Sequence, residues 1–303
     1  MVYSQRSIQS SFTRSHAIVN NVERRSRAPR LGRGREHVTE TPNRRRTEKE
    51  GLVGHQQGGD KGVSAPIIVL SEVSKSFGAL KVADGISVSV PRGEALGIIG
   101  PNGAGKSTLF NLMTGNLAAD SGRIEFLGRD VTRTPAMQRC LHGMGRSFQI
   151  PQPFSKLTVY ENLLVAATFG RNAREAEVME DCAAILEQTG LLGKANATAA
   201  SLSLLERKRL ELARALATAP QLLLLDEIAG GLTEGECKAL VATIRDIHSK
   251  GVTIIWIEHV LHALTSVVER LLVLDFGKVI GIGDPQEIMN SREVREIYLG
   301  IEV

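Results

Sequence analysis

The chain has 303 residues, of which 42% are hydrophobic and 23% are charged, with 37 Lys and Arg against 33 Asp and Glu. This composition is typical of a globular protein that buries one large core or two small ones. The longest apolar runs, "PIIVL" and "QLLLLD", have the length of strands and fall far short of the roughly 20 residues that a membrane-crossing helix needs. If the protein works at a membrane, we expect another chain to cross it.

The three cysteines lie far apart, at Cys140, Cys182 and Cys237. This spacing predicts neither a disulfide framework nor a zinc site. A reducing compartment is the simplest interpretation.

Residues 1–65 differ from the rest of the chain. They hold 13 Lys and Arg against 6 Asp and Glu, so the net positive charge belongs to this tail and the remainder is slightly acidic. The tail is rich in Arg, Ser, Gly and Gln and has no sustained apolar period, which predicts a disordered extension. Its composition also resembles that of an organellar transit peptide, and the basic segment "NRRR" is of a kind that binds nucleic acid or anionic lipid. We favour a solvated extension.

From residue 66 onward, apolar patterns predict an α/β core with a helical insertion. Alternation and then a continuous apolar run over 85–100 indicate strands. A period near 3.6 residues predicts helices over 158–169, 174–190 and 204–219. Strands are predicted again at 221–226, 252–258, 270–275 and 278–283. The helical insertion therefore spans about residues 150–220.

The segment "GPNGAGKST" predicts a phosphate-binding loop. It matches G-x-x-x-x-G-K-[ST] at Gly100, Gly105, Lys106 and Ser107, between the strand "ALGII" and an apolar helix. Glycines let the backbone curl so that its N–H groups point at phosphate oxygens, and the helix N-terminus adds its positive end. We expect Lys106 to reach the β- and γ-phosphates and the Ser107 hydroxyl to hold Mg²⁺.

A second acidic element follows a buried strand in "QLLLLDE". Asp226 is expected to orient a water bound to Mg²⁺, and Glu227 is placed to act as general base on the attacking water. Lys106 and Asp226 are 120 residues apart, far more than one βαβ crossover needs. The helical stretch fills this interval.

The order of these motifs resembles the ATP-binding-cassette (ABC) ATPase family, and the match covers essentially all of residues 66–303. The resemblance implies a P-loop NTPase fold with an antiparallel β subdomain and a helical insertion, and it implies ATP and Mg²⁺ as cofactors. Phe77 matches the position that stacks on adenine, Gln149 the one that senses the metal and attacking water, and His259 the one that contacts the γ-phosphate.

The residue roles that follow form three sets. The catalytic set is Glu227, His259 and Gln149; the metal set is Ser107, Gln149 and Asp226, the last through water; the ATP-binding set is Phe77, Gly100, Pro101, Asn102, Gly103, Ala104, Gly105, Lys106, Ser107 and Thr108, with Ser203 acting on the ATP of a partner cassette.

Several sequence segments resemble those of the ATP-binding subunit of LivG-type, branched-chain amino-acid importers: "LTVYENLL", "RLELARAL", "DEIAGGLTEGE", "VTIIWIEH" and "REIYLG". This resemblance implies a second ABC subunit, identical or different, two integral membrane permease subunits and, indirectly, a periplasmic or extracellular solute-binding protein. It places the chain at the cytoplasmic face of the plasma (inner) membrane, with no nucleic acid. The solute is inferred by analogy, because similar subunits serve urea, amides or other small polar compounds.

The segment "LSLLE", residues 202–206, departs from the family's "LSGGQ" signature. Ser203 is kept, but Leu205 replaces the glycine and Glu206 the glutamine. In this family the signature of one subunit completes the ATP site of its partner. Backbone N–H donors survive the change, whereas the spacing S-x-x-E predicts a capping box that competes for them. We expect a weakened but working half-site; a well-capped helix without a phosphate role is the alternative.

A second departure is Ile228, where the family usually has proline, followed by Gly230 and Gly231 in a loop that lines the subunit interface. We expect altered loop stiffness and intact chemistry. Three other functions stay open: an ABC ATPase of nucleic-acid metabolism, a catalytically weak regulatory cassette, and a cassette that exports lipid or lipopolysaccharide.

Overall fold

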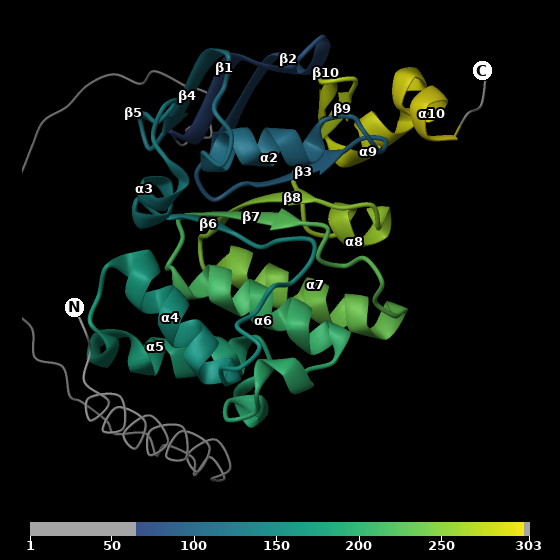
Figure 1. The fold of residues 1–303 in the computed structure, drawn as a ribbon. Helices are drawn as coiled ribbons and strands as arrows, with labels where there is room; N and C mark the ends of the chain where they lie inside the picture. Colours follow the sequence, from purple (N-terminus) through teal and green to yellow (C-terminus); the bar gives the residue numbers. More distant parts are fainter. Residues whose placement is uncertain (1–64, 300–303) are drawn as a thin grey trace, which may run out of the picture.

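The structure, a computed structural model, describes residues 65–299, with side chains as far as Glu296. The extension predicted for residues 1–65 lies outside these residues except for Ala65. Figure 1 shows three layers: an antiparallel sheet, a central sheet and a layer of helices, with helix α2 (Lys106–Thr114) between the two sheets.

The first layer is an antiparallel sheet in the order β2-β1-β4-β5. Its strands are β1 (Pro66–Phe77), β2 (Leu80–Pro91), β4 (Ser121–Phe126) and β5 (Arg129–Asp130). Burial alternates along β2, where Val88 and Val90 are buried and Ser87 and Ser89 are exposed. This period of two is what a sheet with one solvated face requires, and it confirms the alternation predicted from the sequence.

The central sheet has the order β10-β9-β3-β8-β7-β6. Its strands are β3 (Ala95–Ile99), β6 (Met144–Arg146), β7 (Leu222–Asp226), β8 (Thr253–Ile257), β9 (Arg270–Asp275) and β10 (Lys278–Gly283). Neighbours from β9 to β6 run parallel, and β10 runs antiparallel to β9. Because parallel strands bring their carboxyl ends to one edge, the segments after β3, β6, β7 and β8 meet there.

Two apolar cores cover the two faces of the central sheet. Helix α2, β1 and β2 pack against one face, with Phe110 and Leu109 of α2 fully buried. Helices α7 (Glu234–Ser249) and α8 (Leu261–Thr265) pack against the other, around the buried Trp256. Strands β3, β7 and β8 are buried along their whole length, which explains their continuous apolar spelling.

The third layer is the helical insertion, with α4 (Val159–Arg171), α5 (Glu175–Gln188) and α6 (Leu204–Ala217) around a third core. Helix α6 belongs to two cores at once, because Leu210 faces the other insertion helices while Leu212 faces the central sheet. Short elements complete the chain: α3 (Ala136–Leu141), η1 (Leu192–Lys194), η2 (Ala199–Ser201), α9 (Pro285–Asn290) and α10 (Arg292–Leu299).

The predicted fold class is confirmed, and each helix and strand named from the sequence is present within a few residues of its expected ends. Within residues 65–299, every helix is too short or too polar to cross a lipid bilayer.

Candidate functional site

The phosphate-binding loop connects β3 to α2 at the carboxyl edge of the central sheet. A Cβ at Gly100 would lie 2.2 Å from the carbonyl oxygen of Leu274, and one at Gly105 would lie 2.4 Å from that of Val82. Gly105 also has a φ of +100° and caps the N-terminus of α2. Both glycines are therefore required by close backbone approach, and Val82 brings the β1–β2 hairpin against the loop.

Lys106 is buried under this loop. Its Nζ donates to the carbonyl oxygens of Gly100 at 2.7 Å and Pro101 at 3.0 Å. Burial lowers the pKa of the Lys106 ammonium, while the nearby carboxylates of Glu227 and Asp226 oppose the change. The lysine thus lies between the loop and the two acids at the carboxyl end of β7.

Asp226 ends β7 and forms an ion pair with Arg146, the last residue of β6. Arg146 Nη2 lies 2.7 Å from Asp226 Oδ2; Asp226 is buried, and 9% of the Arg146 side chain is exposed. Arg146 Nη1 donates to Asn111 Oδ1 at 2.7 Å, and its guanidinium lies 4.9 Å from the ring centre of Phe148. Because Phe148 directly precedes Gln149, this arginine connects the acid at the end of β7 to the start of the helical insertion.

Glu227 lies at the centre of the site. His259 Nε2 lies 2.6 Å from Glu227 Oε1, and Gln149 Nε2 donates to Glu227 Oε2. The three residues follow β7, β8 and β6 respectively, so the carboxyl edge of the sheet brings together side chains that are far apart in the sequence. The arrangement places a carboxylate, with its orientation fixed on both oxygens, beside the phosphate loop.

Ser107, Gln149 and Asp226 line one cavity of about 530 Å³. Hydroxyl, amide and carboxylate oxygens are hard donors of the kind that Mg²⁺ prefers, and Mg²⁺ is usually bound through a few protein oxygens together with substrate phosphates. The donor set therefore fits Mg²⁺ held largely by a nucleotide. The part of the chain that the structure describes has no cluster of three or more His, Cys, Asp or Glu side chains that could hold a metal by themselves.

The remaining ATP-binding candidates lie around the loop. Asn102 and Gly103 are exposed, Ala104 is buried, and Thr108 is half-buried on the first turn of α2. Phe77 ends β1 with 53% of its surface exposed, and Lys75 Nζ lies 5.7 Å from its ring centre.

Ser203 stands apart from this cluster. It caps α6, where its Oγ accepts from the N–H of Glu206 at 3.3 Å and its own N–H donates to Glu206 Oε2 at 2.9 Å. The predicted capping box is confirmed. These hydrogen bonds from Ser203, together with Lys194, lower the pKa of the Glu206 carboxyl. Leu204 is exposed, so the turn presents an apolar side chain to solvent.

Ile228 and the loop after it are partly buried. Ile228 is 1% exposed and packs in the core under α7. Gly231 has a φ of +75°, and a Cβ there would lie 3.6 Å from Leu204 Cδ2. The loop therefore touches the first turn of α6 in the same chain.

Sequence reasoning missed three charged residues next to this site: Arg146, which is partly buried, and Lys208 and Glu258, which are buried. Lys208 Nζ donates to the carbonyl oxygen of Glu227 at 3.3 Å, and Glu258 Oε2 accepts from the N–H of Ala229 at 2.9 Å. A charged residue inside the apolar stripe of α6, four positions before the buried Leu212, is a signal that could have identified Lys208.

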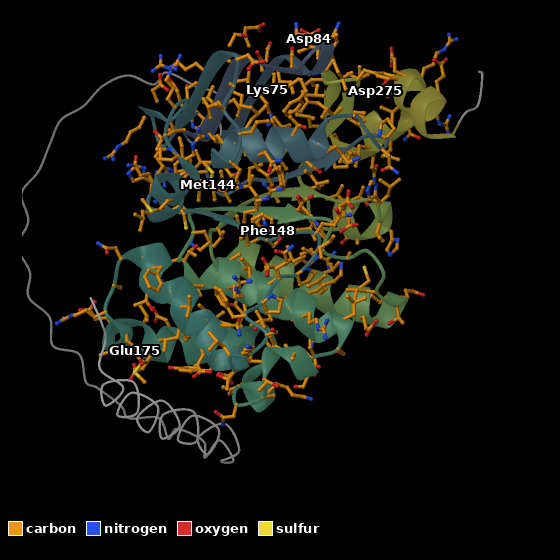
Figure 2. The ribbon with its side chains drawn as sticks, in the orientation of Figure 1. Lys75, Asp84, Met144, Phe148, Glu175 and Asp275 are labelled. Carbon is orange, nitrogen blue, oxygen red and sulfur yellow. The ribbon has the colours of Figure 1, made fainter. Side chains whose placement is uncertain are left out.

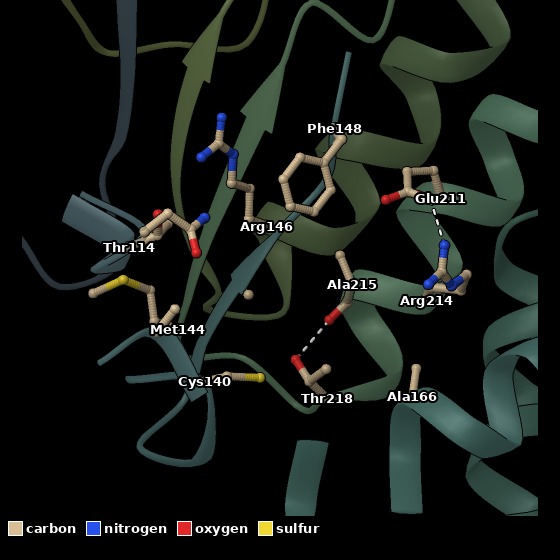
Figure 3. Close-up of a pocket in the computed structure, with 13 residues that line it drawn as sticks. Thr114, Cys140, Met144, Arg146, Phe148, Ala166, Glu211, Arg214, Ala215 and Thr218 are labelled. Carbon is tan, nitrogen blue, oxygen red and sulfur yellow. Dashed lines mark hydrogen bonds and ion pairs between the residues drawn. The ribbon is translucent and has the colours of Figure 1, made fainter. Parts of the chain in front are cut away.

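A cleft of about 230 Å³ separates the central sheet from the helical insertion next to the site (Figure 3). Arg146 and Phe148 line it from the sheet side, and Ala166 and Thr218 from the helices. Figure 2 shows Met144 and Phe148 at this level, below the antiparallel sheet that holds Lys75 and Asp84. Phe148, which lines this cleft, is followed in the sequence by two further exposed apolar side chains, Ile150 and Phe154.

Comparison with known proteins gives consistent matches. The family described as "ABC transporter" matches residues 83–230. The probable branched-chain amino acid transport ATP-binding protein LivG of Methanocaldococcus jannaschii is 34% identical over 77% of this chain and 97% of its own length. The high-affinity branched-chain amino acid transport ATP-binding protein BraF of Pseudomonas aeruginosa is 35% identical over 78% of this chain and 99% of its own.

Two further matches widen the comparison. The lipopolysaccharide export system ATP-binding protein LptB of Haemophilus influenzae is 32% identical over 77% of this chain and 97% of its own length. Among solved structures, the ADP conformation of an ATP-binding cassette of an ABC transporter is 33% identical, with a TM-score of 0.72 over 78% of this chain and 100% of that one.

Proposed function

The chain belongs to the ABC transporter family, in the LivG-type branch of its ATP-binding subunits, and we propose that it powers an importer of branched-chain amino acids or related small polar solutes. It is an ATPase whose hydrolysis drives transport. The observation that supports the importer most directly is the LivG and BraF similarity over nearly their whole length.

The proposed catalytic roles rest on the cluster around Glu227. Glu227 accepts the proton of the attacking water as general base, and Gln149 and His259 hold its two carboxylate oxygens. Lys106 and the phosphate loop bind the β- and γ-phosphates, and Phe77 offers its exposed ring to the adenine. Ser107, Gln149 and, through a water, Asp226 would hold Mg²⁺, which would neutralise phosphate charge.

Two cassettes are proposed to close on two ATP molecules, with Ser203 of each completing the site of the other. ATP drives this closure because it has a higher affinity for the closed pair. The partner is a second ABC subunit, identical or different. The pair lies at the cytoplasmic face of the plasma (inner) membrane, on two permease subunits that a solute-binding protein loads from outside.

The permease contact is proposed for the segment from Gln149 to Glu161. Ile150 is 70% exposed and Phe154 is 49% exposed, and such a run of apolar surface is typical of an interaction site. Asn162 holds the segment in shape, because its Oδ1 accepts from the N–H of Phe154 at 2.8 Å and its Nδ2 donates to Phe154 O at 3.1 Å.

Co-purification of the full chain from native membranes tests this function. We expect two integral membrane chains and a second cassette, with ATPase activity stimulated by a small polar solute together with its binding protein. Ile150→Asp should lose the membrane chains while ATP binding persists, and Phe169→Asp, at another exposed apolar residue, serves as the matched control. Isolation without membrane chains, or with salt-sensitive nucleic acid, would contradict the proposal.

The similarity to LptB favours one alternative, an exporter of lipid or lipopolysaccharide. The same preparation decides between the two, since an exporter is stimulated by amphiphilic lipid and needs no solute-binding protein. Stimulation by a branched-chain amino acid would exclude it.

A further inference from the structure

The backbone at Glu227 is in an unusual conformation. Its φ is +46°, in the left-handed region that non-glycine residues seldom adopt. Such a conformation costs free energy and persists only where surrounding contacts hold it. The position of the Glu227 carboxylate therefore depends on what fixes this turn.

Three contacts hold the turn. The N–H of Glu227 donates to Ile257 O at 2.9 Å, Lys208 Nζ donates to Glu227 O at 3.3 Å, and the N–H of Ala229 donates to Glu258 Oε2 at 2.9 Å. Lys208 is 6% exposed and Glu258 is 1% exposed. One contact comes from strand β8, one from helix α6 and one from the segment that also carries His259.

Lys208 carries a charge that suits this place. Burial lowers the pKa of the Lys208 ammonium, whereas the nearby carboxylates of Glu258 and Glu227 oppose this change. A neutral side chain of the same length would fill the space without attracting either carboxylate and without donating to the carbonyl. We propose that Lys208 is a positioning residue for Glu227, holding the strained turn so that the carboxylate stays aimed at the attacking water.

The location of Lys208 on α6 extends this role. Ser203 caps the helix and Lys208 follows five residues later, about 7.5 Å along the axis at 1.5 Å per residue. The stretch between them is fixed on both sides, because Leu202 and Leu210 pack in the core of the helical insertion. If Ser203 meets a partner's phosphate, as the proposed function holds, the helix transmits that contact to the catalytic carboxylate of its own chain.

Substitution of Lys208 in the full chain, purified with its partner subunits, tests the proposal. Lys208→Met should lower kcat roughly tenfold, as expected for a slightly misplaced catalytic group, and leave KM for ATP nearly unchanged. Lys208→Arg, which keeps charge and donors, should recover most of the rate. Lys238→Met, at an exposed lysine paired with Glu234, should match the wild type. If Lys208→Met does not fold, Lys208→Gln replaces it; because its amide still carries a hydrogen-bond donor but no charge, we expect a loss between those of Lys208→Arg and Lys208→Met.

A double-variant cycle provides the decisive readout. If Lys208 acts through the Glu227 carboxylate, Lys208→Met should have no further effect on the residual rate of Glu227→Gln. Losses that multiply would overturn the role of Lys208 and leave the proposed function standing. Full activity in Glu227→Gln alone would overturn the general base, and this proposal with it. A raised KM with unchanged kcat in Lys208→Met would also overturn the positioning role of Lys208.

Discussion

The catalytic cluster, which comprises Lys106, Gln149, Asp226, Glu227 and His259, differs from the signature turn, Ser203 to Glu206, in where its hydrogen-bond partners come from. Glu227 binds side chains that follow two other strands. Ser203 binds Glu206, three residues further along the same helix. The cluster exists only in the folded chain, whereas the turn is satisfied locally. A phosphate that approaches the turn must therefore displace hydrogen bonds that already exist.

The largest expected effect concerns the long-range contacts of the cluster. Arg146→Met leaves Asp226 buried without its ion partner, which costs about 3–5 kcal/mol of unfolding free energy for a buried pair. Urea unfolding measures the change. Arg146→Met combined with Asp226→Asn should recover part of the loss, and equal stability of wild type and Arg146→Met would show that the ion pair does not hold the cluster together.

Glu227→Gln has the next largest effect. Removing the general base should slow hydrolysis roughly 10²-fold or more, while ATP still binds because the phosphate loop is unchanged. Single-turnover hydrolysis together with nucleotide binding separates the two quantities. Asp275→Asn, at an acid that ends β9 of the same sheet, is the matched control. Wild-type turnover in Glu227→Gln would rule this carboxylate out as the base.

Ser203→Ala tests the local contacts of the signature turn. Loss of an N-cap side chain costs about 1 kcal/mol of stability, and we expect that loss in thermal or urea unfolding. Thr233→Ala, which removes the cap of α7, should cost a similar amount without affecting ATP turnover. If Ser203→Ala lowers turnover in the assembled complex and Thr233→Ala does not, the turn has a role beyond capping.

Leu205→Gly is expected to have the smallest effect. It restores the family's residue and removes a bulky side chain beside the start of the helix. ATPase activity of the assembled complex should therefore rise roughly two- to threefold, which corresponds to a decrease of a few tenths of a kcal/mol in the activation free energy. Leu216→Ala, far along the same helix, controls for a general loosening of α6. A decrease in Leu205→Gly would mean that the leucine is adapted to its partner.

The difference between the two regions also explains what could be predicted from the sequence. The phosphate loop, the acids at the end of β7 and the capping box each lie within a few consecutive residues. The spacing of residues along the sequence is therefore enough to predict them. The ion pair of Arg146 with Asp226 and the contact of Lys208 with Glu227 join residues 80 and 19 positions apart. Nothing in the local pattern encodes such partners, because the order of strands in the sheet creates the first contact and the packing of α6 against the sheet creates the second.

Arg139 has a consequence for how the molecule responds to a nucleotide. Its side chain is 1% exposed, and it donates to the carbonyl oxygens of Leu112 and Met113 at the end of α2 and of Thr134 nearby. The helix that begins at the phosphate loop is therefore clamped at its far end. We expect α2 to stay in place when a nucleotide binds at its first turn, and a conformational change to involve the α4–α6 layer instead.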